Sequence, residues 1–339
     1  MPAAIGTDLV TSISRHILLP VVTDNYYKSN TLTWRMLQAN RRRVRGGTHI
    51  EGSMIYDDMA GGGWFSGFDK ITITPSDTIK NARWDWRFLA QPVVIDATTL
   101  AKLDNALAIA DGVSLIINQA EMRMAEWLAA GLWSDGYNPK SIDGLAYSID
   151  DGTYSTSSTY AQIDRSTNTW FKGKLGTSST VLTENLLMDF YFQCTDEGGG
   201  RTPTIIVSQY PQYVRYYNLN SGNLSYNASA GGTDELMFQK GVSNQVFNGI
   251  PWLVDSHVPT ASAGANSNEI VASSSSSTSD IFFLNEEYIF LYELEGWNFT
   301  MDEFQQPWDQ VVYTSMMRWG GQLVNLSPKH SGRLIGIAA

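Results

Sequence analysis

One long predicted helix constrains the fold of this chain more than any other feature of its sequence. Over residues 96–131, apolar side chains recur at a spacing of seven, which keeps them on one face of a helix. A helix of that length would run about 50 Å, far longer than the mean helix of a globular domain. The positions beside the apolar face are mostly Ala, Asn and Gln, so we expect a single helix lying across a sheet rather than a coiled coil. The apolar positions are Leu103, Ala110, Ile117 and Met124.

A long β-excursion precedes this helix, over residues 46–95. Its sequence alternates between polar and apolar residues in several short runs, as exposed strands do. A glycine-rich tip at residues 61–67 carries Trp64 and Phe65. A ribbon of two strands has too little core to be stable alone in water, so we expect it to lie on a neighbouring surface. The predicted strands are 48–56, 71–75 and 82–88.

The rest of the chain indicates an α+β protein. Residues 1–45 have no strong periodicity and are predicted to form an arm rather than part of the core. Residues 135–290 mix helical and strand patterns, and strands close the chain after residue 290. The predicted helices are 182–194 and 211–218, and the predicted strands are 204–208, 309–324 and 334–337. A turn followed by a strand is predicted over 247–255, and a Ser-rich surface loop over 261–280.

The composition suggests that partner subunits cover much of the surface. Of the 339 residues, 17% are charged and 12% are aromatic, against about 25% charged in an average soluble domain. The net charge of -11 argues against a dedicated nucleic-acid-binding protein. No run approaches the roughly 18 apolar residues of a membrane span. The single cysteine, Cys194, cannot form an internal disulfide and is expected to lie in the core.

Two clusters of opposite charge stand out. A basic cluster with no acid inside it lies near residue 40, and an acidic stretch with no Lys or Arg lies over 280–309. The basic cluster could be a solvated loop, a subunit contact or a weak contact to nucleic acid. The two clusters could also pair with each other, within the molecule or between copies. The basic cluster is Arg35, Arg41, Arg42, Arg43 and Arg45, and the acidic stretch includes Glu286, Glu287, Glu293 and Glu295.

No catalytic, cofactor or metal site is predicted. The four His residues do not pair at metal-ligand spacing, and the chain has no phosphate loop, dinucleotide fingerprint or nucleophile elbow. Adjacent acids occur at Asp57-Asp58 and Glu286-Glu287, but nothing in the sequence sets them at hydrolase spacing. The many Trp and Tyr residues leave a carbohydrate-binding or carbohydrate-active β-rich protein as the alternative function, although packing explains them more simply.

The order of the predicted elements resembles one family. An arm, an unsupported β-excursion, a long helix, a mixed α/β region and closing strands follow one another in the major capsid proteins of tailed bacteriophages, which have the HK97-type fold. Local segments also resemble that family, and the resemblance covers most of residues 35–339. The segments are 163–170 (IDRSTNTW), 247–255 (FNGIPWLVD) followed by 281–285 (IFFLN), and 319–324 (WGGQLV) ahead of Pro328.

The resemblance implies a division of the chain into the parts of an HK97-like capsid fold. These are an N-terminal arm, an extended β-hairpin called the E-loop, a P-domain built on the long spine helix, and a mixed α/β A-domain. The implied boundaries are 1–45 for the arm, 46–95 for the E-loop, 96–134 and 295–328 for the P-domain, and 135–294 and 329–339 for the A-domain.

The resemblance also implies the function and the partners. Many copies would form pentamers and hexamers in an icosahedral shell around phage double-stranded DNA, assembled in the host cytoplasm. We expect no long pro-segment to be removed, so a separate scaffolding protein is implied, together with a portal and, optionally, a decoration protein. DNA would be contacted weakly and without sequence specificity, and no membrane would be involved. Lys70 and Lys80 lie in the E-loop, but we expect no covalent cross-linking.

We expect the inter-subunit contacts to lie at the hairpin tip and at the charge clusters. The tip would pack on the adjacent subunit, and the basic cluster would reach an acidic surface of a neighbour, with 280–309 as the first candidate. A decoration or tail-tube protein is a further alternative, although such proteins are usually shorter and lack the long helix. The expected contact residues are Arg41, Arg42, Arg43, Arg45, Trp64, Phe65, Glu286, Glu287, Glu293 and Glu295.

Overall fold

The computed structural model describes residues 31–71, 75–98, 106–136, 138–153, 157–177, 181–221, 245–259 and 278–338. The helices are α2 (Thr31–Ala39), α4 (Ala106–Leu132), α5 (Leu145–Ser148), α6 (Glu184–Glu197) and α7 (Tyr210–Ser221). The strands are β1 (Arg41–Val44), β2 (His49–Ile55), β3 (Ile79–Asp85), β4 (Arg87–Asp96), β5 (Thr159–Tyr160), β6 (Ile163–Asp164), β7 (Lys174–Thr177), β8 (Ile205–Ser208), β9 (Val246–Phe247), β10 (Ile250–Val254), β11 (Thr278–Leu284), β12 (Ile289–Leu294), β13 (Thr300–Met301), β14 (Val312–Asn325) and β15 (Gly332–Ala338).

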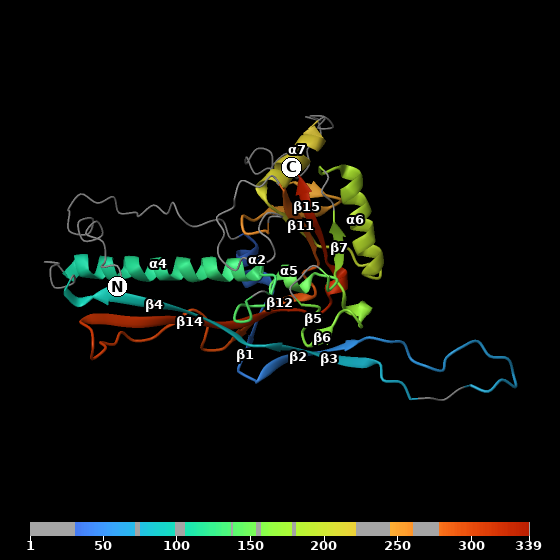
Figure 1. Ribbon diagram of the computed structural model, residues 1–339, viewed down its shortest axis with the longest axis horizontal. Helices are drawn as coiled ribbons and strands as arrows, with labels where there is room; N and C mark the ends of the chain where they lie inside the picture. Colours follow the sequence, from blue (N-terminus) through green and yellow to red (C-terminus); the bar gives the residue numbers. More distant parts are fainter. Residues whose placement is uncertain are drawn as a thin grey trace, which may run out of the picture.

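The long helix α4 lies along an extended antiparallel pair of strands (Figure 1). The strands are β4 and β14, which pair from Arg87↔Gly321 to Asp96↔Val312. The predicted helix over 96–131 is confirmed from Ala106 to Leu132, which is about 40 Å of helix. Residues 99–105, which the prediction also included, lie outside the described residues.

The main core fills the space between α4 and this sheet. Met124 and Leu128 of α4 belong to the same buried cluster as Met317, Trp319 and Leu323 of β14. Each of these side chains is at most 2% exposed. Of the predicted apolar positions, Met124 is buried in this cluster and Ile117 packs against it, whereas Leu103 and the side chain of Ala110 lie outside the described residues.

Part of the predicted arm belongs to this core, which corrects the sequence interpretation for residues 31–44. Leu32 and Met36 of α2 are buried in the main cluster. Strand β1 then pairs in parallel with β12, with Arg43 opposite Glu293. The partner strand lies about 250 residues away along the chain, so local periodicity could not reveal the pairing. Residues 1–30 of the predicted arm lie outside the described residues.

A six-stranded sheet in the order β7-β15-β11-β8-β10-β9 forms a second body. Its four-residue strand β8 is entirely buried, and α6 and α7 contribute to the same apolar cluster. A tight turn joins β9 to β10, with Asn248 at φ 48° and Gly249 at φ 82°, which suits a two-residue hairpin. The predicted helices and strands of this region are confirmed. The Ser-rich loop predicted over 261–280 is wrong for its last three residues, which begin strand β11 at Thr278, and its residues 261–277 lie outside the described residues.

The predicted β-excursion divides into two parts. Strands β2 and β3 pair with each other from His49↔Asp85 to Ile55↔Ile79, whereas β4, predicted as part of the same excursion, belongs to the sheet under α4. Beyond β2 and β3 the hairpin extends away from both sheets (Figure 1). Residues 71 and 75 of the strand predicted at 71–75 have no regular structure, and 72–74 lie outside the described residues.

Replacing either of two tryptophans by alanine should affect the free energy of unfolding very differently. Trp319 is 1% exposed in the core under α4, whereas Trp308 is 99% exposed. We expect Trp319→Ala to lower the free energy of unfolding by about 3–5 kcal/mol, the usual effect of emptying a large buried site. The control Trp308→Ala should change it by less than about 0.5 kcal/mol. Urea denaturation of the unassembled chain measures both, and equal effects would contradict this description of the core.

Candidate assembly surfaces

The hairpin tip presents large apolar side chains that pack on nothing in the described chain. Trp64 and Phe68 are fully exposed, and Phe65 and Met59 are each more than two-thirds exposed. The last ladder contact joins the Tyr56 amide to the Thr78 carbonyl at 3.0 Å. A contiguous exposed apolar surface on a soluble protein usually marks an interaction site.

The base of the hairpin packs against the body of the protein. Trp84 of β3 is buried in a cluster with Ile50, Tyr160 and Val324. The Trp84 and Tyr160 rings meet edge to face with centroids 6.2 Å apart. This aromatic anchor, made by segments far apart in the sequence, fixes β2 and β3 against the body of the protein.

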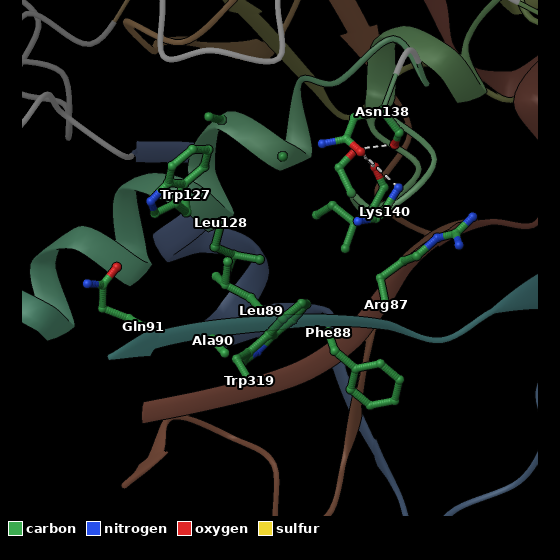
Figure 2. Close-up of a pocket in the computed structure, with 14 residues that line it drawn as sticks. Arg87, Phe88, Leu89, Ala90, Gln91, Trp127, Leu128, Asn138, Lys140 and Trp319 are labelled. Atoms are coloured by element: carbon green, nitrogen blue, oxygen red, sulfur yellow. Dashed lines mark hydrogen bonds between the residues drawn. The ribbon is translucent and has the colours of Figure 1, made fainter. Parts of the chain in front are cut away.

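A groove opens between β4, the C-terminal part of α4 and the loop at residues 138–142 (Figure 2). Its volume is about 350 Å³. Trp127 and Gln91 lie toward one end, and Arg87 and Lys140 toward the other. None of its 14 lining residues is acidic. Sequence reasoning missed this groove because it forms only where β4 and Trp319 of β14 meet the end of α4 and the loop after it.

The charges of the tip and the groove are opposite. The tip segment 56–71 carries Asp57, Asp58 and Asp69 but only one basic residue, Lys70. Lys140 at the rim of the groove is exposed. An acidic, aromatic tip and a basic, partly apolar groove are complementary surfaces, and attraction between them would guide their encounter.

The basic cluster and the acidic stretch meet within one chain. Arg35 grips the Glu286 carboxylate with two hydrogen bonds of 2.5 and 2.9 Å. Arg45 bonds Glu295 at 2.9 Å. The two clusters therefore pair within one molecule, where α2 and β1 run beside the segment that contains β12.

The remaining members of the two clusters have different surroundings. Arg41 lies 3.7 Å from the buried Glu293 carboxylate. Arg42 stacks on the ring of Phe290 at 3.7 Å. Arg43 is exposed and has no ion pair among the residues that the structure describes. Contact of any of these groups with a neighbouring subunit stays a prediction.

The side chains considered for catalysis in the sequence analysis are engaged in ion pairs or buried. Glu286 is held by Arg35, and Glu287 is paired with Arg201 at 2.6 Å, so this acid pair does not present two free carboxylates. Burial raises the pKa of the Cys194 thiol to about 12, which keeps it protonated and unreactive. No cluster of metal-binding side chains occurs among the described residues. None of the helices in that part of the chain is long and apolar enough to span a membrane.

Comparison with known proteins gives matches at the level of structure only. No family model and no curated protein matches the chain. The capsid of cyanophage A-1(L) is similar with a TM-score of 0.66 and 13% identity, over 96% of this chain and 97% of that one. The capsid of a native GTA particle gives 0.61 and 12%, covering 96% of each chain. The SrpI encapsulin of Synechococcus elongatus PCC 7942 gives 0.59 and 9%, over 96% of this chain and 93% of that one.

Asp143, beside the groove, predicts a pH-dependent stability. Its carboxylate accepts a hydrogen bond of 3.0 Å from Gln322 and lies 4.0 Å from Arg87. Burial raises the pKa of Asp143 to about 6, although the Arg87 charge opposes the shift. The folded state therefore holds this proton more tightly than the unfolded state, and stability decreases as the pH rises from about 4 to about 6.

We expect Asp143→Asn to remove this loss. The variant should gain about 3 kcal/mol over the wild type between pH 4 and pH 7, because it cannot ionise. Denaturant titrations at the two pH values measure the difference. A difference that does not change with pH would show that Asp143 ionises as it does in water.

Proposed function

We propose that this chain, which has the HK97-type fold of capsid and encapsulin proteins, is the major capsid protein of a tailed bacteriophage. Copies of it would assemble as pentamers and hexamers into an icosahedral shell around double-stranded DNA. The observation that carries the proposal is the hairpin whose tip exposes Trp64, Phe65 and Phe68 with no partner among the residues that the structure describes. Self-assembly into a shell would supply the missing partner.

The proposed contact places the tip of one copy on the groove of the next. An aromatic side chain buries roughly 150–250 Å². At about 25 cal/mol per Å², two or three such residues stabilise each contact by several kcal/mol before the costs of association. The contact joins two different surfaces, so it repeats head to tail and closes into a ring when the rotation fits. Many modest contacts then hold a closed shell together.

The proposed partners follow from the phage role. They are many copies of the chain itself, a separate scaffolding protein, a portal and, optionally, a decoration protein. The net charge of -11 fits a shell wall that touches packaged DNA only weakly. We assign the chain no enzymatic activity and no cofactor, because a shell protein acts through its contacts. The finished protein would reside in the virion capsid after assembly in the host cytoplasm.

A protein-filled compartment is the second candidate, because an encapsulin is among the structural matches. The contents of purified particles distinguish the two. We expect particles from the native source to contain nuclease-resistant double-stranded DNA. Particles that hold a protein cargo and no DNA would favour the compartment, and a chain that forms no shell would overturn both.

Removing the aromatic tip should impair assembly. We expect the double variant Trp64→Ser/Phe65→Ser to remain as free subunits or capsomers, because the apolar area of the contact is lost. The matched variant Trp64→Tyr/Phe65→Tyr keeps the rings and should form shells. Negative-stain images and sedimentation velocity record the outcome. Heat-resistant shells of normal size from the Ser variant would refute a role for the tip.

A disulfide tests where the tip lies. Ser66 is in the tip, Asn138 lines the groove, and the only native cysteine, Cys194, is buried. We expect Ser66→Cys/Asn138→Cys to form covalent multimers when assembled shells are oxidised, visible as a ladder on a non-reducing gel. Ser66→Cys alone should give no ladder beyond dimers. Shells that assemble but do not cross-link would place the tip elsewhere and leave the shell function standing.

A further inference from the structure

A buried chain of two carboxylates and one imidazole joins three elements of the body. His257, which follows β10, lies with Nε2 2.9 Å from Glu126 Oε1 and with Nδ1 3.2 Å from Asp255 Oδ1. Glu126 comes from α4, and it is 2% exposed, while Asp255 is fully buried. Neither the shell role nor the hairpin contact explains this cluster.

The same cluster holds the start of α2. The second carboxylate oxygen of Asp255, Oδ2, accepts a hydrogen bond of 3.1 Å from the backbone amide of Leu32. That amide lies in the first turn of α2, where helix N–H groups have no partner within the helix. A negative charge at this end also favours the helix dipole. The N-terminal helix is therefore fixed to α4 through Asp255, His257 and Glu126.

The two carboxylates beside His257 favour a charged imidazole. Both ring nitrogens of His257 face carboxylate oxygens, which accept hydrogen bonds and do not donate them. A neutral ring carries one N–H and can satisfy only one of the two carboxylates. Within the described residues, His257 is also the only donor to Glu126, whose Oε2 is buried without a partner. Asp255 Oδ1 also accepts a hydrogen bond of 2.9 Å from the backbone amide of His257. Loss of the proton therefore either leaves the buried Glu126 without a donor or sets the bare Nδ1 lone pair against Asp255 Oδ1, and both arrangements are costly.

The surroundings contain no other charge that could take over this role. Glu126 and Asp255 are the charged groups that act on His257 in the described chain. Arg35 is the single charged residue of α2, and Glu286 holds it. Burial lowers the pKa of His257, but hydrogen bonds and charge from Asp255 and Glu126 outweigh burial and raise the pKa above its ordinary value.

We propose that His257 is a proton-operated latch that holds the N-terminal helix α2 against the spine helix α4. The protonated ring bridges Glu126 and Asp255 and keeps Asp255 in place over the Leu32 amide. The deprotonated ring breaks one of the two bridges and loosens α2. The inference concerns the fixing of the N-terminal segment and does not depend on the proposed shell.

The direction of the pH effect follows from the raised pKa. The protonated ring of His257 stabilises the folded state fully below the unfolded-state pKa of histidine, about 6.5. This stabilisation is lost as the pH rises through the higher pKa of His257 in the folded state. The latch is thus closed in acid and opens toward alkaline pH.

Hydrogen exchange of the α2 amides tests the latch in the full-length chain. Mass spectrometry would follow peptides covering Thr31–Ala39 from about pH 6 to about pH 9, with rates corrected for intrinsic exchange. We expect protection of α2 in the wild type to fall by about tenfold or more over this range, the factor that one charge-assisted hydrogen bond is worth. Protection of the core of α4 should stay constant.

Two variants distinguish the latch from a general loss of stability at alkaline pH. Glu126→Gln replaces the carboxylate by an amide that can donate to the neutral ring, so its α2 protection should stay high at alkaline pH. His49→Gln removes an exposed histidine that contacts Glu51 and should keep the wild-type step. A wild type without a step, or a Glu126→Gln variant with the same step as the wild type, would overturn the proposal.

Discussion

A two-stranded ribbon cannot bury its own side chains, and this constraint shapes the whole molecule. Strands β2 and β3 have a packed base around Trp84, but the chain beyond them exposes aromatic residues to solvent. An apolar surface of this kind is unfavourable in water unless something covers it. No described part of the same chain covers the tip, and we propose that the covering surface comes from another molecule. The packed base around Trp84 holds the hairpin from which the tip would reach that surface.

The rest of the structure acts as a rigid frame for this contact. Strand β14 spans 14 residues and pairs with β4 along its first part and with β12 along its second part. The helix α4 covers this long sheet, and β12 in turn holds β1 through the in-register pairing of the basic and acidic segments. One strand thus connects the spine helix, the N-terminal segment and the hairpin base, since Val324 of β14 also lies in the cluster around Trp84.

The sequence predicted the elements that depend on local patterns. The seven-residue spacing indicated α4, alternation indicated β2 and β3, an apolar and aromatic run indicated β14, and flanking glycines marked the tip with Trp64 and Phe65. Local sequence patterns could not predict which distant strands pair. Strand β4 was grouped with the hairpin because its partner lies more than 200 residues later, and residues 31–44 were taken as an arm because β12 is equally remote. The groove and the Glu126–His257–Asp255 cluster form only where separate segments converge, so no single sequence motif predicts them.

The central claim is that the hairpin tip finds its partner surface only on another copy of the chain. Hydroxyl-radical footprinting of unassembled and assembled protein measures this most directly, because oxidation of Met59, Trp64, Phe65 and Phe68 reports their exposure to solvent. The account requires all four to be modified readily in free subunits and to be strongly protected in assembled particles, while the exposed Trp34 serves as an internal reference. Equal modification of the tip in the two states would contradict it.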